Sequence, residues 1–102
     1  MRRVLPQRRK AVTRDFSVRG LRYSVTLGYY PDGQLGEVFL NSAGKFGADA
    51  GIAAMEAAIV ASFALQFGAT PEAMRAALPR NENGDAEGPL GCLLDLLEGS
   101  AS

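Results

Sequence analysis

Four residues near the middle of the chain have the types that bind an anion: Ser42, Gly44, Lys45 and Gly47. Glycines expose backbone N–H groups and lysine adds a positive charge. A helix is expected to begin directly afterwards, and a helix N-terminus favours a phosphate or carboxylate. The spacing differs from that of a Walker A loop, and a plain connection between strand and helix is the competing interpretation. The plain connection is the favoured interpretation, and these four residues are the best candidate in the sequence for binding a small anion.

Two carboxylates, Asp32 and Glu37, lie on either side of a predicted turn. Such a pair could hold a cation or act as acid and base. In the simpler interpretation Asp32 hydrogen-bonds the turn, and Glu37 faces solvent or pairs with an arginine. The simpler interpretation is favoured because no third catalytic group accompanies the pair.

The residue types that complete most catalytic sites are missing from this chain. It has no histidine, and Cys92 is its one cysteine. The commonest general base and metal ligand is therefore absent, as is a second thiol for redox chemistry. We predict no catalytic residue, no metal site and no bound cofactor, so that the chain acts by binding. A single cysteine that cannot form an internal disulfide also predicts a cytoplasmic location.

The formal net charge of zero hides a basic N-terminus. Most of the cations lie in the first 22 residues, where Asp15 is the only acid. We predict a flexible basic arm over residues 1–14, able to meet nucleic acid, an acidic partner or the acidic surface of its own chain. A solvated N-terminus without a role is the alternative. The arm residues concerned are Arg2, Arg3, Arg8, Arg9, Lys10 and Arg14.

The elements that must position these residues begin with three strands. Alternation of polar and apolar residues predicts a short strand over 15–18 and a half-buried strand over 21–29. Tyr30-Pro31-Asp32-Gly33 predicts a tight turn, and a third strand follows over 36–41. Three consecutive strands with short connections predict an antiparallel β-meander.

Three helices are predicted to cover that sheet. The first begins near Asp49 and ends at Gly68, with Ile52, Met55, Ile59 and Phe63 at helical spacing. Thr70 and Pro71 predict the start of a second helix, and a third runs from 89 to 99. The predicted fold class is therefore α+β: a three-stranded antiparallel β-meander followed by three helices packed on one face, with one domain over 15–99 after the basic arm.

One apolar run, over 51–67, is long enough to require a membrane test. It contains Glu56, Ser62 and Gln66 and is rich in alanine, which contributes little to insertion. A buried helix is the better interpretation, and we predict no membrane association.

Two stretches resemble a known family. They are Gly20-Leu21-Arg22-Tyr23-Ser24-Val25-Thr26-Leu27-Gly28 with Tyr30-Pro31-Asp32-Gly33-Gln34-Leu35-Gly36-Glu37-Val38-Phe39-Leu40, and the helix end Ala61-Ser62-Phe63-Ala64-Leu65-Gln66-Phe67-Gly68. Together they resemble the TSCPD domain, the C-terminal module of adenosylcobalamin-dependent (class II) ribonucleotide reductases, which also occurs in free-standing form. The positions that match the family motif are Asp32, Gly33, Gly36, Glu37, Lys45, Gly47 and Gln66.

The resemblance implies a link to ribonucleotide reduction, and by label alone it would suggest a ribonucleoside-diphosphate reductase. The cysteine motif that names the domain is absent, however, as are the radical cysteine and the cobalamin-binding barrel of the full enzyme. Adenosylcobalamin is therefore expected only through a full-length reductase, and a chain of 102 residues cannot perform the reaction unaided.

These observations leave a main hypothesis and several alternatives. The main one is a non-catalytic accessory, regulatory or nucleotide/anion-binding module linked to deoxyribonucleotide synthesis, with a reductase as protein partner. One alternative is a small phage or mobile-element interaction or inhibitor protein that binds a host protein or nucleic-acid complex through the arm. Direct nucleic-acid binding by the arm is another. A homodimer is possible because a three-stranded sheet has an edge available for pairing.

Overall fold

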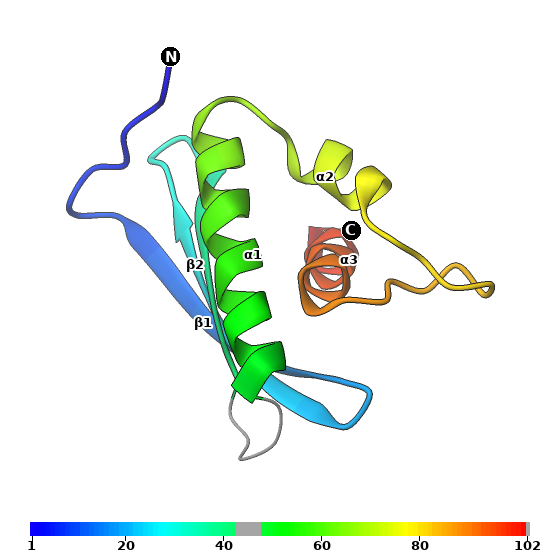
Figure 1. Cartoon of the computed structure of the whole chain (residues 1–102). Helices are drawn as coiled ribbons and strands as arrows, with labels where there is room; N and C mark the ends of the chain where they lie inside the picture. Colours follow the sequence, from blue (N-terminus) through cyan, green and yellow to red (C-terminus); the bar gives the residue numbers. More distant parts are fainter. Residues whose placement is uncertain (43–47, 102) are drawn as a thin grey trace.

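The computed structural model describes residues 1–42 and 48–101 of the chain. A three-stranded antiparallel sheet in the order β1-β2-β3 is followed by three helices, which confirms the predicted α+β class. Figure 1 shows α2 and α3 together on one side of the sheet. The elements are β1 Lys10–Val18, β2 Leu21–Tyr29, β3 Leu35–Ser42, α1 Ala48–Gln66, α2 Pro71–Ala77 and α3 Pro89–Ala101.

Short turns hold the strands in register. Arg19 (φ 49°) and Gly20 (φ 80°) form the two-residue connection between β1 and β2. Positive φ at both positions matches the right-handed twist of the flanking strands. In the predicted turn after β2, the Gly33 N–H donates to the Tyr30 carbonyl oxygen at 2.9 Å, and Gly33 has φ 90°. The predicted turn at Tyr30-Pro31-Asp32-Gly33 is therefore present.

Several element boundaries differ from those predicted, and the start of β1 differs most. Strand β1 begins at Lys10, so it includes Lys10 to Arg14, which were predicted to belong to a flexible arm. These residues pair with β2 without interruption, from Lys10 opposite Tyr29 to Val18 opposite Leu21. Pairing with a strong neighbouring strand supplies a reason for extended structure that the polar composition of this segment does not reveal. Helix α3 also continues past Gly99, to Ala101.

The core lies between one face of the sheet and α3. Pairing in register places Val25 opposite Leu40 and Leu27 opposite Val38, so these four side chains share a face. Each is at most 1% exposed. From α3, Leu93 joins the same apolar cluster, with Leu94 also buried. We call this face the core face of the sheet.

Helix α1 packs along the outer edge of β3. Ser62 Oγ accepts a hydrogen bond from the Val38 N–H at 2.8 Å and lies 3.1 Å from the Val38 carbonyl oxygen. Gln66 Nε2 donates to the Gly36 carbonyl oxygen at 3.0 Å. A Cβ on Gly51 would lie 2.7 Å from Ser42 Oγ, so the helix approaches the strand closely. Side chains of α1 thus provide partners for backbone groups that an edge strand would otherwise expose.

The face of α1 that packs inward is made of small residues. Ala54 and Ala58 are each 1% exposed and Ala61 is 3% exposed. The row predicted from helical spacing, Ile52 to Phe63, lies on the opposite side and is about half exposed. Contact between a helix and a strand edge requires short side chains, because the two backbones come close together. The apolar periodicity therefore did not identify the buried face.

Candidate functional site

The N-terminal residues lie against the domain and bring two sets of predicted site residues together. Arg3 pairs with Asp32 at 2.9 Å, Arg9 pairs with Glu37, and Arg2 Nε donates to Gln66 Oε1 at 2.6 Å. Arginines predicted to belong to a flexible arm thus contact residues predicted from the family motif. We call these six residues the N-terminal clasp: Arg2, Arg3, Arg9, Asp32, Glu37 and Gln66.

Tyr30 holds Arg3 of the clasp through two contacts. The guanidinium carbon of Arg3 lies 3.7 Å from the centroid of its ring. The Tyr30 hydroxyl donates to the Arg3 carbonyl oxygen at 2.7 Å, and the Arg3 N–H donates to the Gln66 carbonyl oxygen at 2.6 Å. A cation over an aromatic face and two backbone hydrogen bonds fix this segment more firmly than a surface ion pair would.

The two carboxylates of the clasp each have their own arginine, which agrees with the structural interpretation of the Asp32/Glu37 pair. The N–H of Gln34 and the guanidinium of Arg3 hold the pKa of Asp32 below its usual range. Glu37 is only 6% exposed. It lies over Gly28, where an added Cβ would come 2.4 Å from the Glu37 carboxylate. Gly28 therefore leaves the space that the Glu37–Arg9 pair occupies.

Two glycines of the family motif, Gly36 and Gly33, also have structural roles. A Cβ on Gly36 would lie 2.6 Å from the Tyr30 ring and 2.7 Å from Leu5. Gly36 therefore allows the N-terminal segment and Tyr30 to pack on the start of β3. Gly33 supplies the positive φ of the turn.

The remaining arm cations have different surroundings. Arg8 and Lys10 line a pocket of about 680 Å³ together with Arg9, Tyr29 and Tyr30. Arg14 lies on β1 and lines a separate cleft. The structure therefore distributes the predicted arm over a clasp, a pocket and a strand.

The predicted anion-binding loop is only partly described. Gly44, Lys45 and Gly47 lie outside the described residues. Ser42 is the last residue of β3, with its Oγ directed at Gly51 of α1. The anion site stays a prediction.

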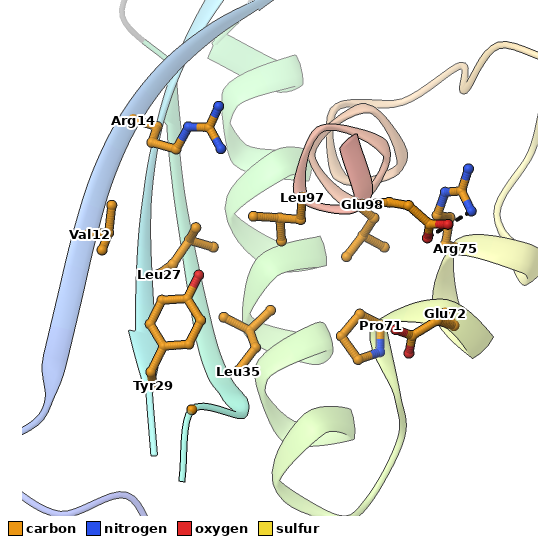
Figure 2. Close-up of a pocket in the computed structure, with 12 residues that line it drawn as sticks. Val12, Arg14, Leu27, Tyr29, Leu35, Pro71, Glu72, Arg75, Leu97 and Glu98 are labelled. Atoms are coloured by element: carbon orange, nitrogen blue, oxygen red, sulfur yellow. Dashed lines mark hydrogen bonds and ion pairs between the residues drawn. The ribbon is translucent and has the colours of Figure 1, made fainter. Parts of the chain in front are cut away.

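A cleft of about 690 Å³ opens between the core face of the sheet and the helices α2 and α3. Figure 2 shows Val12, Leu27, Tyr29 and Leu35 on the side of the strands, facing Leu97 of α3. This volume lies within the range of about 300–1,000 Å³ typical of ligand sites. The cleft is lined by Val12, Arg14, Leu27, Tyr29, Gly33, Leu35, Pro71, Glu72, Arg75, Leu94, Leu97 and Glu98.

Charged side chains border this apolar cleft. Arg14 reaches in from β1, and Glu72 and Glu98 border it from the helices (Figure 2). Arg75 pairs with Glu98 at 3.1 Å and with Asp95 at 2.6 Å. The cleft is therefore amphipathic, with a cation on the sheet side and carboxylates on the helix side.

Asp95 links α2 and the segment after it to α3. Arg80 and Arg75 donate to its carboxylate at 2.7 Å and 2.6 Å, and they lower the pKa of Asp95 to about 2. Because α2 makes few other buried contacts, with none of its residues fully buried, these ion pairs fix the helical wall of the cleft.

Cys92 is a packed thiol. It is partly buried against the core, and its Sγ donates to the Ala86 carbonyl oxygen at 3.5 Å. Burial raises the pKa of the Cys92 thiol, and the nearby Asp95 carboxylate adds to this effect. A raised pKa disfavours the reactive thiolate at neutral pH.

Large apolar side chains are exposed along the outward side of α1, at Phe67 directly after its end, and at Phe39 of the adjacent strand β3. Among the described residues, this set includes seven of the ten exposed large hydrophobic residues, and all seven are between 47% and 67% exposed. We call it the α1 outer surface: Phe39, Ile52, Met55, Ile59, Val60, Phe63 and Phe67. The guanidinium carbon of Arg2 lies 4.8 Å from the Phe63 ring centroid at one end of it.

By length and composition, α1 contains a stretch that could cross a membrane, Asp49–Gln66, of which 33% is buried. Among the residues 1–42 and 48–101, no group of three or more metal-ligating acids, cysteines or histidines occurs.

Sequence reasoning missed the cleft and the outward orientation of the α1 row. The cleft depends on how far α2 and α3 stand from the sheet, which no local pattern encodes. Val12, Phe16 and Val18 fall on alternate positions, with Thr13, Asp15 and Ser17 between them, and that alternation was the available signal for β1.

Comparison of the chain with protein-family models, with curated proteins and with solved structures found no match.

Proposed function

We propose that this chain is a non-catalytic accessory module that acts by docking onto a protein partner through the α1 outer surface. The resemblance to the TSCPD domain supports a partner from ribonucleotide reduction, and a cytoplasmic location is part of the same proposal. The observation that carries the docking part is the set of seven exposed apolar side chains on and beside α1. Large exposed apolar patches on soluble proteins mark sites of interaction with another molecule.

A protein partner is favoured over a membrane by the way α1 is attached. The side chains of Ser62 and Gln66 form hydrogen bonds with the backbone of β3. Ala54 and Ala58 are packed in the core. Inserting α1 into a bilayer would leave the Val38 N–H and the Gly36 carbonyl oxygen without these partners. Such a loss costs about 1–3 kcal/mol for each buried group. A protein that covers only the outward row keeps all these bonds.

The nucleic-acid alternative receives less support. It relies on the arm cations, but Arg2, Arg3 and Arg9 have partners within the chain. Each of these arginines already uses guanidinium donors within the chain, so only its remaining donors could bind a phosphate. The anion-binding role of residues 42–47 is a separate part of the proposal. It is tested by calorimetric titration of the wild-type protein and of Lys45→Ala with deoxyribonucleoside triphosphates.

The docking proposal is tested with purified class II ribonucleotide reductase and the purified chain, by biolayer interferometry. Ile59→Glu places a charge at the middle of the α1 outer surface. Leu96→Glu is the matched control, because Leu96 is an exposed apolar residue (41%) on a different helix. We expect binding by the wild-type chain, a loss of at least about tenfold for Ile59→Glu and wild-type affinity for Leu96→Glu.

The outcomes separate the two parts of the proposal. No binding of the wild-type chain to the reductase would remove the link to ribonucleotide reduction. Equal weakening by the two glutamate substitutions would show that the α1 outer surface is not the docking site.

A further inference from the structure

The two edges of the sheet are treated differently in this fold. The edge at β3 is covered by α1, whereas in the described part of the chain β1 has a neighbour on one side only, β2. β1 is nine residues long, contains no proline and pairs with β2 without a bulge. Proteins usually shorten, bend or cover such an edge, because it can accept another strand.

The hydrogen-bonding pattern identifies the backbone groups that β1 presents outward. Val38 directs its N–H and carbonyl toward Ser62, so it does not exchange hydrogen bonds with Leu27, its partner in β2. Because the pattern alternates in antiparallel pairs, Leu27 exchanges them with Val12 of β1. The residues between these inward-bonded positions therefore direct their N–H and carbonyl groups to the free edge: Ala11, Thr13, Asp15 and Ser17.

The amphipathic cleft adjoins this edge. Val12 and Arg14 of β1 line it, and β1 is the outermost strand on that side. A strand added beside β1 would direct alternate side chains toward the core face, next to these two residues. The other side chains would lie beside Ala11 and Thr13, which are exposed. Backbone hydrogen bonds and a side-chain site thus occur together, as in recognition by strand addition.

We propose that β1 and the adjoining cleft bind an extended segment of another protein, which adds to the sheet as a fourth strand. Its chemistry follows from the core-face residues of β1. An apolar residue faces Val12, and acidic residues face Lys10 and Arg14, since opposite charges stabilise directly opposed positions. This site lies apart from the α1 outer surface and does not depend on the reductase proposal.

Charge favours a different protein over a second copy of this chain as the occupant. Symmetric antiparallel pairing of β1 with itself, centred on Arg14 or Asp15, places that residue opposite its own copy. Centred on Val12, it places Lys10 opposite Arg14. Like charges at directly opposed positions are destabilising. Three of the symmetric registers are thereby disfavoured, whereas an acidic segment meets no such repulsion.

The test uses the full chain labelled with ¹⁵N and the blocked peptide Thr-Glu-Thr-Ile-Thr-Glu-Thr. This sequence reads the same in both directions, so parallel and antiparallel binding are both sampled. A second peptide, with lysines in place of the glutamates, tests the charge requirement. We expect saturable shifts at the amides of Ala11, Thr13, Asp15 and Ser17 with the acidic peptide, and slower hydrogen exchange there. The lysine peptide is expected to bind about tenfold more weakly.

Two substitutions distinguish binding by strand addition from non-specific binding. Thr13→Pro removes an outward N–H and leaves the inward bonds to β2, so we expect about tenfold weaker binding. Arg14→Glu is expected to reverse the preference between the two peptides. Should circular dichroism show that Thr13→Pro is unfolded, Ala11→Pro provides the same test at a neighbouring outward position.

Three results would overturn the proposal. The first is an acidic peptide that fails to saturate at millimolar concentrations. The second is equal binding by wild type and the folded proline variant. The third is a dimer in light scattering that Thr13→Pro dissociates, since the edge would then be filled by a second copy.

Discussion

The sheet has one edge that the fold closes and one that it leaves open. At the closed edge, the hydroxyl of Ser62 and the amide of Gln66 bond the backbone of β3, and small residues of α1 pack against it. At the open edge, where β1 has no second strand beside it in the described part of the chain, Lys10, Arg14 and Asp15 are all exposed. Charges at an edge discourage unselective pairing but still allow a partner with complementary charges.

The difference between the edges shows where specificity is encoded. The closed edge depends on close packing and on one particular hydroxyl, so it should tolerate little change. The open edge depends on exposed side chains and should tolerate substitution in the folded protein while changing what it binds. The contrast is tested by measuring the free energy of unfolding of a variant at one position and of a control variant at another position.

The largest effect is expected from Ala58→Leu, on the inward side of α1. Ala58 is 1% exposed and packs against β3, so a leucine would push the helix from the strand. We expect a loss of about 3 kcal/mol in the free energy of unfolding. Ile59→Ala is the control, since Ile59 is 49% exposed on the outward side, and it should cost less than about 1 kcal/mol. Urea denaturation measures both, and the opposite ranking would mean that α1 packs through its large residues.

The next effect concerns the hydroxyl of Ser62. Ser62→Ala removes the partner of the Val38 N–H, and Val38 is fully buried at 0% exposure. We expect a loss of about 2 kcal/mol, the cost of leaving a buried donor unpaired. Ser17→Ala at the open edge is the matched control and should change stability by less than about 0.5 kcal/mol. Equal effects in the two serine variants would show that α1 is not required to satisfy the β3 backbone.

Several elements of the fold could be predicted from the sequence, but not the way in which α1 closes the edge of the sheet. The alternation over 21–29, the turn at Gly33 and the N-cap at Thr70 each follow a local rule, and the structure confirms all three. The burial of α1 could not be predicted in the same way. Its most apolar row, which includes Met55 and Phe63, faces outward, because contact with a strand edge selects for small residues rather than for apolar ones.

The open edge and the cleft were harder to predict for a different reason. β1 contains Lys10, Arg14 and Asp15 and has one buried side chain, Val18 at 8% exposure, so composition alone favours a loop. Its strand structure comes from pairing with β2, a contact between segments that local propensity does not capture. For the clasp, Asp32, Glu37 and Gln66 could be selected by resemblance. Their arginine partners could not be, because residues up to 64 positions apart meet there.

A smaller effect is expected where ion pairs hold the helical wall of the cleft. Arg80 and Arg75 lower the pKa of Asp95 to about 2, below its usual value of 3.8. A lowered pKa means that the pairing stabilises the fold above about pH 4 and that this contribution is lost as pH falls toward 2. Asp95→Asn should therefore cost about 1 kcal/mol at pH 6, because the pair is partly screened by solvent.

The pH dependence distinguishes this ion pairing from simple packing. Urea denaturation at pH 6, 4 and 2 should show wild type and Asp95→Asn converging as the pH falls. A difference between them that stays constant down to pH 2 would mean that the side chain of Asp95 acts by shape and not by charge. Ser62→Ala, whose effect involves no titrating group, should keep its difference from wild type over the range.

The smallest effect is expected at the open edge itself. Ala11 is exposed and directs its N–H away from β2, so Ala11→Pro removes no bond of the sheet. Proline is tolerated at such outward positions and restricts the unfolded chain, so the free energy of unfolding should change by less than about 0.5 kcal/mol. Val12→Pro, one residue along, removes an inward bond to Leu27 and should cost at least about 2 kcal/mol. Because the two positions are adjacent on one strand, their difference in urea midpoint reports the direction of the backbone groups. Similar losses at both would place a bonding partner on the outer side of β1, and the edge would then not be open.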